Sequence, residues 1–311
     1  FFGCIMPINF SDLILSFIIS IYLGSKIFNG TEVFGNIIKL LRGKTGITLG
    51  KFIDNINKKF NFTLYYLLMI IWIASYPKSG NTWLRTLISS YYYSKDGTFH
   101  SDLIQQIGQF PEKRHFESFN YDAKSVIGTT KFWIKAQEKI NQDQKIRFFK
   151  THNVYGKIND NHFTNKKNSL GCIYIVRDPR NVITSLSNHY ELSYEDSLNW
   201  MINHKKYIFD NRDGKDFGNF QFISSWSNNY KSWKIQKDLP IKIIRYEDLL
   251  EKTYAVTKEI IIFINHITKK NLKIDTNKLR NSINSTSFDR LKKNEIKNGF
   301  SEAIFSKEKK K

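Results

Sequence analysis

The segment IASYPKSGNTWLRTLI, residues 73–88, places a Pro-Lys-Ser-Gly turn between an apolar run and a stretch with helical spacing. Gly80 allows the backbone to approach a ligand closely. The helix after it opens with amide N–H groups that lack an intrahelical partner, and these form an anion site. The loop adds one mobile positive charge, Lys78, and three side-chain donors, Ser79, Asn81 and Thr82. The segment therefore favours a phosphate-like ligand, although an ordinary strand-to-helix turn has the same features.

The order of the loop residues differs from that of the phosphate-binding loop of kinases and ATPases. In that loop the lysine follows the last glycine, as Gly-Lys-Ser or Gly-Lys-Thr. Here Lys78 precedes Gly80, so the lysine approaches a bound anion from a different direction. The order disfavours a P-loop nucleotide kinase, which stays as an alternative function.

Polar residues also follow three further apolar runs. FFKTHN places Lys150 and His152 after one run, VRDPRNVITS places Arg177 eight residues before Ser185, and RYEDLL places Tyr246 after another. A single histidine is often only structural. A histidine that follows a strand, beside a lysine and in a chain with a phosphate-type loop, is a better candidate for a general base.

The elements that must position these residues alternate from residue 69 onward. Four short apolar runs have the pattern of buried strands, and they are MIIWIAS, KIRFF, LGCIYIV and PIKII. Helical spacing follows the runs at several points. Strands that alternate with helices predict a mostly parallel central sheet flanked by helices, with ligands at the carboxyl ends of the strands. We therefore predict an α/β fold of the P-loop-like, three-layer type.

The chain is strongly basic, with 48 Lys and Arg against 28 Asp and Glu and a formal net charge of +20. Such a charge favours anionic partners, namely nucleotides, sulfated or phosphorylated substrates, nucleic acid or a membrane surface. A solvated basic surface without function explains the charge equally well. The two cysteines, Cys4 and Cys172, belong to no metal-ligand pattern and indicate a reducing compartment. A cytoplasmic location is expected.

Residues 1–68 differ in character from the rest and are interpreted as an N-terminal extension. The apolar core of DLILSFIISIYLGSKIF is about a dozen residues long, whereas a membrane-spanning helix needs roughly 20. No positively charged segment with a cleavage site precedes it. Association with a membrane stays open, and residues 69–311 are predicted to form the enzyme domain.

Taken together, the motifs resemble those of the sulfotransferase superfamily, whose members use 3′-phosphoadenosine-5′-phosphosulfate (PAPS). YPKSGNTW is similar to that family's 5′-phosphosulfate loop, usually Tyr-Pro-Lys-Ser-Gly-Thr-Thr-Trp, with Asn81 in place of a threonine. IYIVRDPRNVITS resembles the 3′-phosphate motif, and KTH resembles the segment with the catalytic histidine. YEDLL and STSFDRLKKNE resemble segments around the adenine. The resemblance covers about residues 69–311.

The resemblance implies a role for each matching residue. Lys78 would stabilise the leaving group, and His152 would act as the general base. The 5′-phosphosulfate would lie against Lys78, Ser79, Gly80, Asn81 and Thr82; the 3′-phosphate would bind Arg177 and Ser185; and the adenine would contact Trp83, Tyr246, Thr286, Ser287 and Phe288. The family also has a glycine-containing segment near its C-terminus, and none follows Phe288 here. A chain truncated at its C-terminal end is therefore expected.

The function that the resemblance implies is in-line transfer of a sulfuryl group from PAPS to a hydroxyl or amine. The acceptor would be a small molecule, a lipid or a carbohydrate; no nucleic acid and no metal ion are expected. Two alternatives stay open, a P-loop nucleotide kinase and a basic protein that binds nucleic acid or a membrane surface. The sequence predicts neither the acceptor nor the oligomeric state.

Overall fold

The structure of the chain, a computed structural model, describes residues 70–143, 145–209, 216–270 and 272–298. The extension predicted for residues 1–68 lies outside the described residues, and so does the segment 299–311. The motifs singled out in the sequence all fall within the described part of the chain. The domain boundary and the C-terminal truncation stay predictions.

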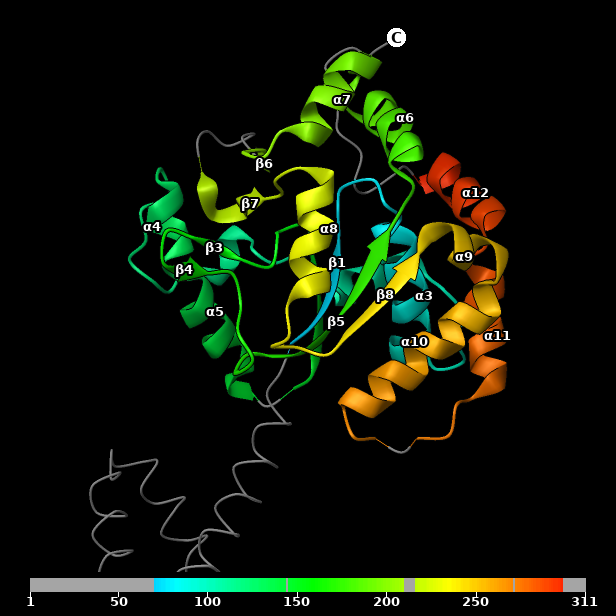
Figure 1. The fold of residues 1–311 in the computed structure, drawn as a ribbon. Coiled ribbons are helices and arrows are strands. Elements are labelled where there is room, and N and C mark those ends of the chain that lie inside the picture. The colour runs from blue at the N-terminus through cyan, green and yellow to red at the C-terminus, as the bar shows by residue number, and fades with distance from the viewer. Residues whose placement is uncertain (1–69, 144, 210–215, 271, 299–311) are drawn as a thin grey trace, which may run out of the picture. The chain divides into compact units, whose positions relative to one another are not determined.

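Four parallel strands form the central sheet (Figure 1). In spatial order they are β2 (Arg147–Thr151), β1 (Ile70–Ser75), β5 (Ser169–Val176) and β8 (Ile241–Arg245). They correspond to the four apolar runs of the sequence, so the predicted parallel sheet is confirmed. Every residue of β1 is buried, because both faces of the sheet are covered, and its sequence is therefore apolar up to Ser75.

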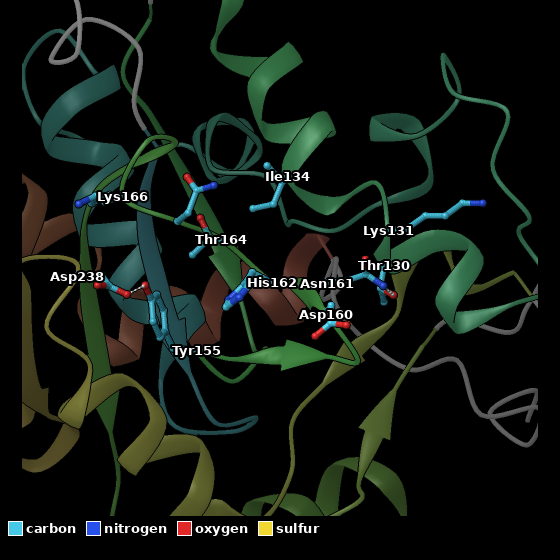
Figure 2. A pocket seen from close by; sticks show the side chains of 11 residues that line it. Thr130, Lys131, Ile134, Tyr155, Asp160, Asn161, His162, Thr164, Lys166 and Asp238 are labelled. Atoms are coloured by element: carbon cyan, nitrogen blue, oxygen red, sulfur yellow. Dashed lines mark hydrogen bonds between the residues drawn. The ribbon is translucent and has the colours of Figure 1, made fainter. Parts of the chain in front are cut away.

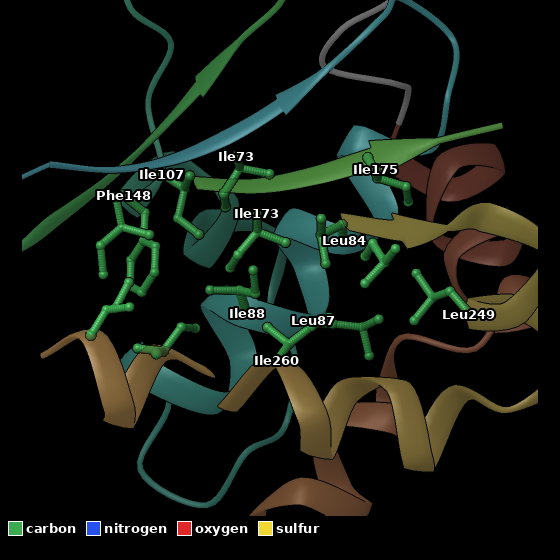
Figure 3. Packing of buried hydrophobic residues seen from close by; sticks show 14 of the residues in the cluster. Ile73, Leu84, Leu87, Ile88, Ile107, Phe148, Ile173, Ile175, Leu249 and Ile260 are labelled. Atoms are coloured by element: carbon green, nitrogen blue, oxygen red, sulfur yellow. The ribbon is translucent and has the colours of Figure 1, made fainter. Parts of the chain in front are cut away.

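Helices cover one face of the sheet with an aliphatic layer, as Figure 3 shows. The helices are α3 (Asn81–Tyr93), α10 (Thr253–Ile267) and α11 (Thr276–Ser285). Ile73 and Ile173 point from the strands toward Leu87 of α3 and Ile260 of α10, and all four are buried. Burial of one such side chain contributes about 1.5–3 kcal/mol. This layer fixes α3 against the sheet and thereby fixes the loop that precedes α3.

Aromatic side chains fill the opposite face. The helices there are α5 (Trp133–Ile140) and α8 (Trp226–Ile235). Trp72 and Tyr174 alternate with the residues of the aliphatic layer and pack instead with Trp133, Phe163 and Trp233. Since successive residues of a strand point to opposite faces, one strand supplies both layers. The predicted three-layer arrangement is confirmed.

Further α-helices and strands belong to the described part of the chain. They are α4 (Val126–Thr130), α6 (Pro179–Tyr190), α7 (Tyr194–Ile202), α9 (Tyr246–Glu251), α12 (Phe288–Asn298), the pair β3 (Lys157–Ile158) and β4 (Asn161–His162), and the pair β6 (Tyr207–Ile208) and β7 (Gln221–Phe222). The carboxylate of Asp178 accepts from the backbone N–H of Arg180 and so caps the start of α6. Among the described helices, none is long and apolar enough to cross a membrane.

Candidate active site

The strands of the sheet are parallel, so their carboxyl ends lie at one edge, and the predicted site residues follow those ends. The Pro-Lys-Ser-Gly turn follows β1, His152 follows β2, Arg177 follows β5 and Tyr246 follows β8. Ligands of open α/β sheets bind at this edge. Segments that are far apart in the sequence thus supply one site.

The turn after β1 has a backbone that only particular residues tolerate. Lys78 has φ 65° and Gly80 has φ 95°, both in the left-handed region. A Cβ atom at Gly80 would lie 2.4 Å from Cδ2 of Tyr246. The glycine is therefore required both by its dihedral angle and by the close approach of Tyr246. Directly after it, α3 begins at Asn81 and presents its first amide N–H groups at the same edge.

Two buried donors of the site have no hydrogen-bond partner among the described residues. Ser79 is fully buried, and its hydroxyl is one of these donors; Nε of Arg177 is the other. A buried polar atom without a partner costs about 1–3 kcal/mol. An anion at this edge would supply acceptors for both atoms. The residues present therefore fit a phosphate or phosphosulfate group.

Arg177 connects the turn to β8. Its Nη1 donates to the carbonyl of Lys78 at 3.1 Å, and its Cζ lies 4.5 Å from the centroid of the Tyr246 ring. Ser185, the second residue of the predicted 3′-phosphate motif, lies half-buried on α6. The structure brings Arg177 to the turn, whereas Ser185 takes part in none of the hydrogen bonds that join the site residues described here.

Two aromatic side chains, Trp83 and Tyr246, form a wall beside the turn. Trp83 meets Tyr246 edge to face, with ring centroids 5.8 Å apart, and its Nε1 donates to the carbonyl of Thr286 at 3.0 Å. The structure thus brings together three of the residues expected around the adenine. The other two differ, since Ser287 is half-buried and Phe288, at the start of α12, is 65% exposed.

Hydrogen bonds to the ring and to the backbone hold His152 just after β2. Its Nδ1 lies 2.7 Å from the carbonyl oxygen of Ser75. Its backbone N–H donates to Oε1 of Gln221 at 2.7 Å, and its carbonyl accepts from Nδ2 of Asn229 at 2.9 Å. Because a carbonyl oxygen can only accept, Nδ1 carries the proton in the neutral ring and Nε2 carries the lone pair. His152 is 8% exposed. The arrangement suits a base whose active nitrogen is Nε2.

The side chain of Asn81 turns into the protein. Its Nδ2 donates to the carbonyl of Ile73 at 3.0 Å and to the hydroxyl of Ser75 at 3.1 Å. From its sequence, Asn81 is expected to contact the anion through its hydrogen-bonding side chain. In the structure that amide nitrogen bonds the end of β1 instead.

Sequence reasoning missed Ser75, Gln221 and Asn229, which hold His152. Ser75 could have been found, because it ends the strand that leads into the turn. Gln221 and Asn229 carry no local signal, since they lie 69 and 77 residues from His152 in the sequence.

A cavity of about 370 Å³ lies away from these residues, between the β3–β4 pair and the segments that precede β5 and β8 (Figure 2). Its lining residues are Thr130, Lys131, Ile134, Tyr155, Asp160, Asn161, His162, Thr164, Asn165, Lys166 and Asp238. The hydroxyl of Tyr155 donates to Asp238 at 2.9 Å across one side of it. None of the predicted site residues lines this cavity.

Comparison with known proteins agrees with the fold. A parallel α/β sheet with a glycine-containing turn and a helix N-terminus at its carboxyl edge is typical of nucleotide-binding proteins. Within that class, the model of the sulfotransferase domain matches residues 70–311. The chain belongs to the sulfotransferase domain family and is an enzyme, so the family prediction made from the motifs is confirmed.

Individual relatives are distant. Sulfotransferase 1A1 of Mus musculus is 22% identical over 258 residues, which is 81% of this chain and 77% of the mouse protein. Luciferin sulfotransferase of Photinus pyralis is 24% identical over 232 residues, 73% of this chain and 57% of the firefly protein. A solved structure of retinol dehydratase with retinol and PAP is 14% identical, covers 78% of this chain and 74% of that chain, and has a TM-score of 0.46. Membership of the family supports sulfuryl transfer in general.

Proposed function

We propose that the chain transfers a sulfuryl group from PAPS to a hydroxyl or amine acceptor. The observation that carries the proposal is the pair of buried donors without partners, Ser79 Oγ and Arg177 Nε, at the edge where Lys78 also lies. PAPS has anionic groups at its 5′ and 3′ positions, and the turn and Arg177 offer donors for both. The wall formed by Trp83 and Tyr246 offers apolar surface for the adenine.

The residues of the turn would hold the 5′-phosphosulfate. The first N–H groups of α3 and the hydroxyl of Ser79 donate to its oxygens, and Lys78 neutralises charge that develops on the leaving oxygen. Preorganised donors of this kind are worth about 10²–10³ in turnover each. Little covalent chemistry is needed from the protein, because the transferred group passes in line between two oxygens or to a nitrogen.

His152 would remove the proton of the acceptor. Its Nδ1 donates to the carbonyl of Ser75, so Nε2 is the nitrogen that accepts the proton. A positioned base typically contributes about 10²–10⁴-fold. As the proton arrives, the carbonyl of Ser75 stabilises the charged ring. The acceptor is proposed to be a small molecule, a lipid or a carbohydrate.

Binding and transfer can be measured on the same preparation. Calorimetric titration should show tighter binding of adenosine 3′,5′-bisphosphate (PAP) than of ATP, because ATP lacks the 3′-phosphate. Incubation with ³⁵S-labelled PAPS and a panel of phenols, alcohols and amines should label at least one acceptor. Equal affinity for ATP and PAP, or magnesium-dependent ATP turnover without sulfuryl transfer, would overturn the proposal in favour of a kinase.

Two matched serine variants test whether the hydroxyl of Ser79 binds the anion. Ser79→Ala should weaken PAP binding about tenfold, as expected for the loss of a hydrogen bond to a charged group. Ser197 on α7 is also fully buried, and its hydroxyl also has no partner among the described residues. Ser197→Ala is expected to leave PAP affinity unchanged. The same affinity in both variants would remove Ser79 from the anion site.

A further inference from the structure

The contacts of Asn81 lead toward the proposed base, not toward the anion. The amide of Asn81 is 5% exposed and donates to two atoms at the end of β1, the carbonyl of Ile73 and the hydroxyl of Ser75. Ser75 in turn lies against the ring of His152. Its carbonyl is 2.7 Å and its hydroxyl oxygen 3.2 Å from Nδ1. Asn81, Ser75 and His152 therefore form one buried chain of hydrogen-bonded groups.

The direction of each hydrogen bond in this chain sets the protonation of the ring. The amide nitrogen of Asn81 can only donate, so the hydroxyl oxygen of Ser75 accepts from it. The carbonyl of Ser75 can only accept, so Nδ1 of His152 carries a proton. The hydroxyl of Ser75 can accept from the amide and still donate its own proton, so it is the carbonyl of Ser75, 2.7 Å from Nδ1, that requires the proton on Nδ1. The proton on Nδ1 leaves the lone pair on Nε2.

We infer that Asn81 is a positioning residue for His152, which acts through Ser75 to keep the imidazole in the Nδ1–H tautomer. Without the amide, the end of β1 loses the hydrogen bonds that hold Ile73 and Ser75 in place, so the carbonyl of Ser75 can move away from Nδ1 and its hydroxyl can donate to Nδ1 in its stead. That hydrogen bond favours the opposite tautomer, in which Nε2 carries the proton and cannot act as a base. The inference rests on the proposed function only for its kinetic consequence, since the tautomer is a property of the protein alone.

The first test reads the tautomer directly. In ¹⁵N-histidine-labelled protein without nucleotide, the His152 ring, assigned with a His152→Gln variant among the seven histidines, should give the chemical shifts of the Nδ1–H form. Asn81→Ala should shift the populations toward the Nε2–H form, whereas Ser75→Ala should not, because it removes the hydroxyl that lies 3.2 Å from Nδ1. An unchanged ring in Asn81→Ala would overturn the inference.

Kinetics supply the second test. Asn81→Ala should lower kcat/KM about tenfold or more for an alcohol acceptor and much less for a phenol of low pKa, which gives up its proton without help. PAP affinity should stay within about twofold. A large loss of PAP affinity, with equal losses of kcat/KM for the alcohol and the phenol, would show that Asn81 binds the anion and would overturn the inference. A wild-type protein without sulfuryl transfer would instead overturn the proposed function, and the tautomer test would still decide the inference.

A matched control separates positioning from stability. Asn141 is also 5% exposed, and its Nδ2 donates to the carbonyl of Asn168 at 3.2 Å, away from the site. Asn141→Ala should lower Tm to a similar extent as Asn81→Ala and leave both the His152 tautomer and the ratio of alcohol to phenol activity unchanged. If Asn141→Ala changed that ratio as much, the effect would be one of stability and the inference would fail. If Asn81→Ala does not fold, Asn81→Leu, which has nearly the same size and no amide donor, takes its place in the tautomer experiment.

Discussion

The guanidinium of Arg177 lies against the ring of Tyr246, with Cζ 4.5 Å from the ring centroid, while its Nη1 donates to the carbonyl of Lys78. These residues follow β5, β8 and β1, so one side chain connects the ends of three strands. A guanidinium can stack on an aromatic ring and still present N–H donors to an anion. Arg177 is thus oriented without a ligand, which lowers the ordering cost of binding.

Replacement of Arg177 by lysine tests this arrangement. Arg177→Lys keeps the charge but loses the planar donors and the stacking on Tyr246. PAP should therefore bind about tenfold more weakly, which corresponds to about 1.4 kcal/mol of binding free energy. The control is Arg180→Lys, a change on α6 at a side chain that is 87% exposed and paired with Asp178; it should leave affinity unchanged. Calorimetry measures both. Identical affinity in wild type and Arg177→Lys would exclude Arg177 from the anion site.

The glycine of the turn gives a steric prediction. Gly80→Ala should destabilise the fold by about 1–3 kcal/mol, because φ 95° strains an alanine and its Cβ would lie 2.4 Å from Tyr246. PAP binding should fall at least tenfold, since the turn must shift. Gly156→Ala is the control, because its Cβ would meet only Val154, at 3.6 Å. Urea denaturation and calorimetry report the two effects, and an alanine at residue 80 that is tolerated in both would contradict the geometry.

Lys78 is expected to act on the transition state more than on the bound ground state. Lys78→Ala should lower kcat about 10²–10³-fold and weaken PAP binding far less. Since Lys78 has φ 65°, a second variant, Lys78→Gly, keeps that backbone without strain and should lose as much turnover. Steady-state kinetics beside PAP titration would decide. A Lys78→Gly enzyme with normal kcat would show that the ammonium group has no part in the chemistry.

The fold could be predicted because its signals are local. The run MIIWIAS is apolar up to its last residue, as expected for a strand buried on both faces, and Gly80 lies in the turn that follows it. The same locality explains why the predicted residues His152, Arg177 and Tyr246 all follow strand ends in the structure. In a parallel sheet, position after a strand is enough to predict the edge at which a residue lies.

The contacts within the site could not be predicted in the same way. An asparagine in the first turn of a helix can donate to a ligand or to its own protein, and only the position of the Ile73 carbonyl decides between them. Gln221 reaches His152 from the short strand β7. The motifs predict a role for Ser185 and for Phe288. A motif does not predict, however, whether a side chain contacts the other site residues, and Phe288 is largely exposed.

A pH-dependent contribution to stability is expected from His115, which lies outside the proposed site. Its ring packs against the rings of Phe110 and Phe149, and its Nδ1 accepts from the backbone N–H of Glu112 at 3.1 Å. Burial, with a smaller effect from the charge of Arg114, lowers the pKa of His115 to about 4. In the unfolded chain the pKa is about 6.5. Between these values the unfolded state binds a proton that the folded state does not, so stability falls as pH falls from about 6.5 to about 4.

The variant that tests this is His115→Asn, whose Oδ1 can accept the same hydrogen bond and does not titrate. Urea denaturation at pH 7 and pH 4.5 should show that wild type loses more stability on acidification than the variant, by an amount on the order of 2–3 kcal/mol, because each pH unit in this window is worth about 1.4 kcal/mol. Carboxylates titrate in both proteins and cancel in the difference. His100→Asn, at an exposed histidine, serves as the control and should keep the wild-type pH dependence. Parallel pH profiles of wild type and His115→Asn would show that the His115 ring is protonated as readily in the folded protein as in water.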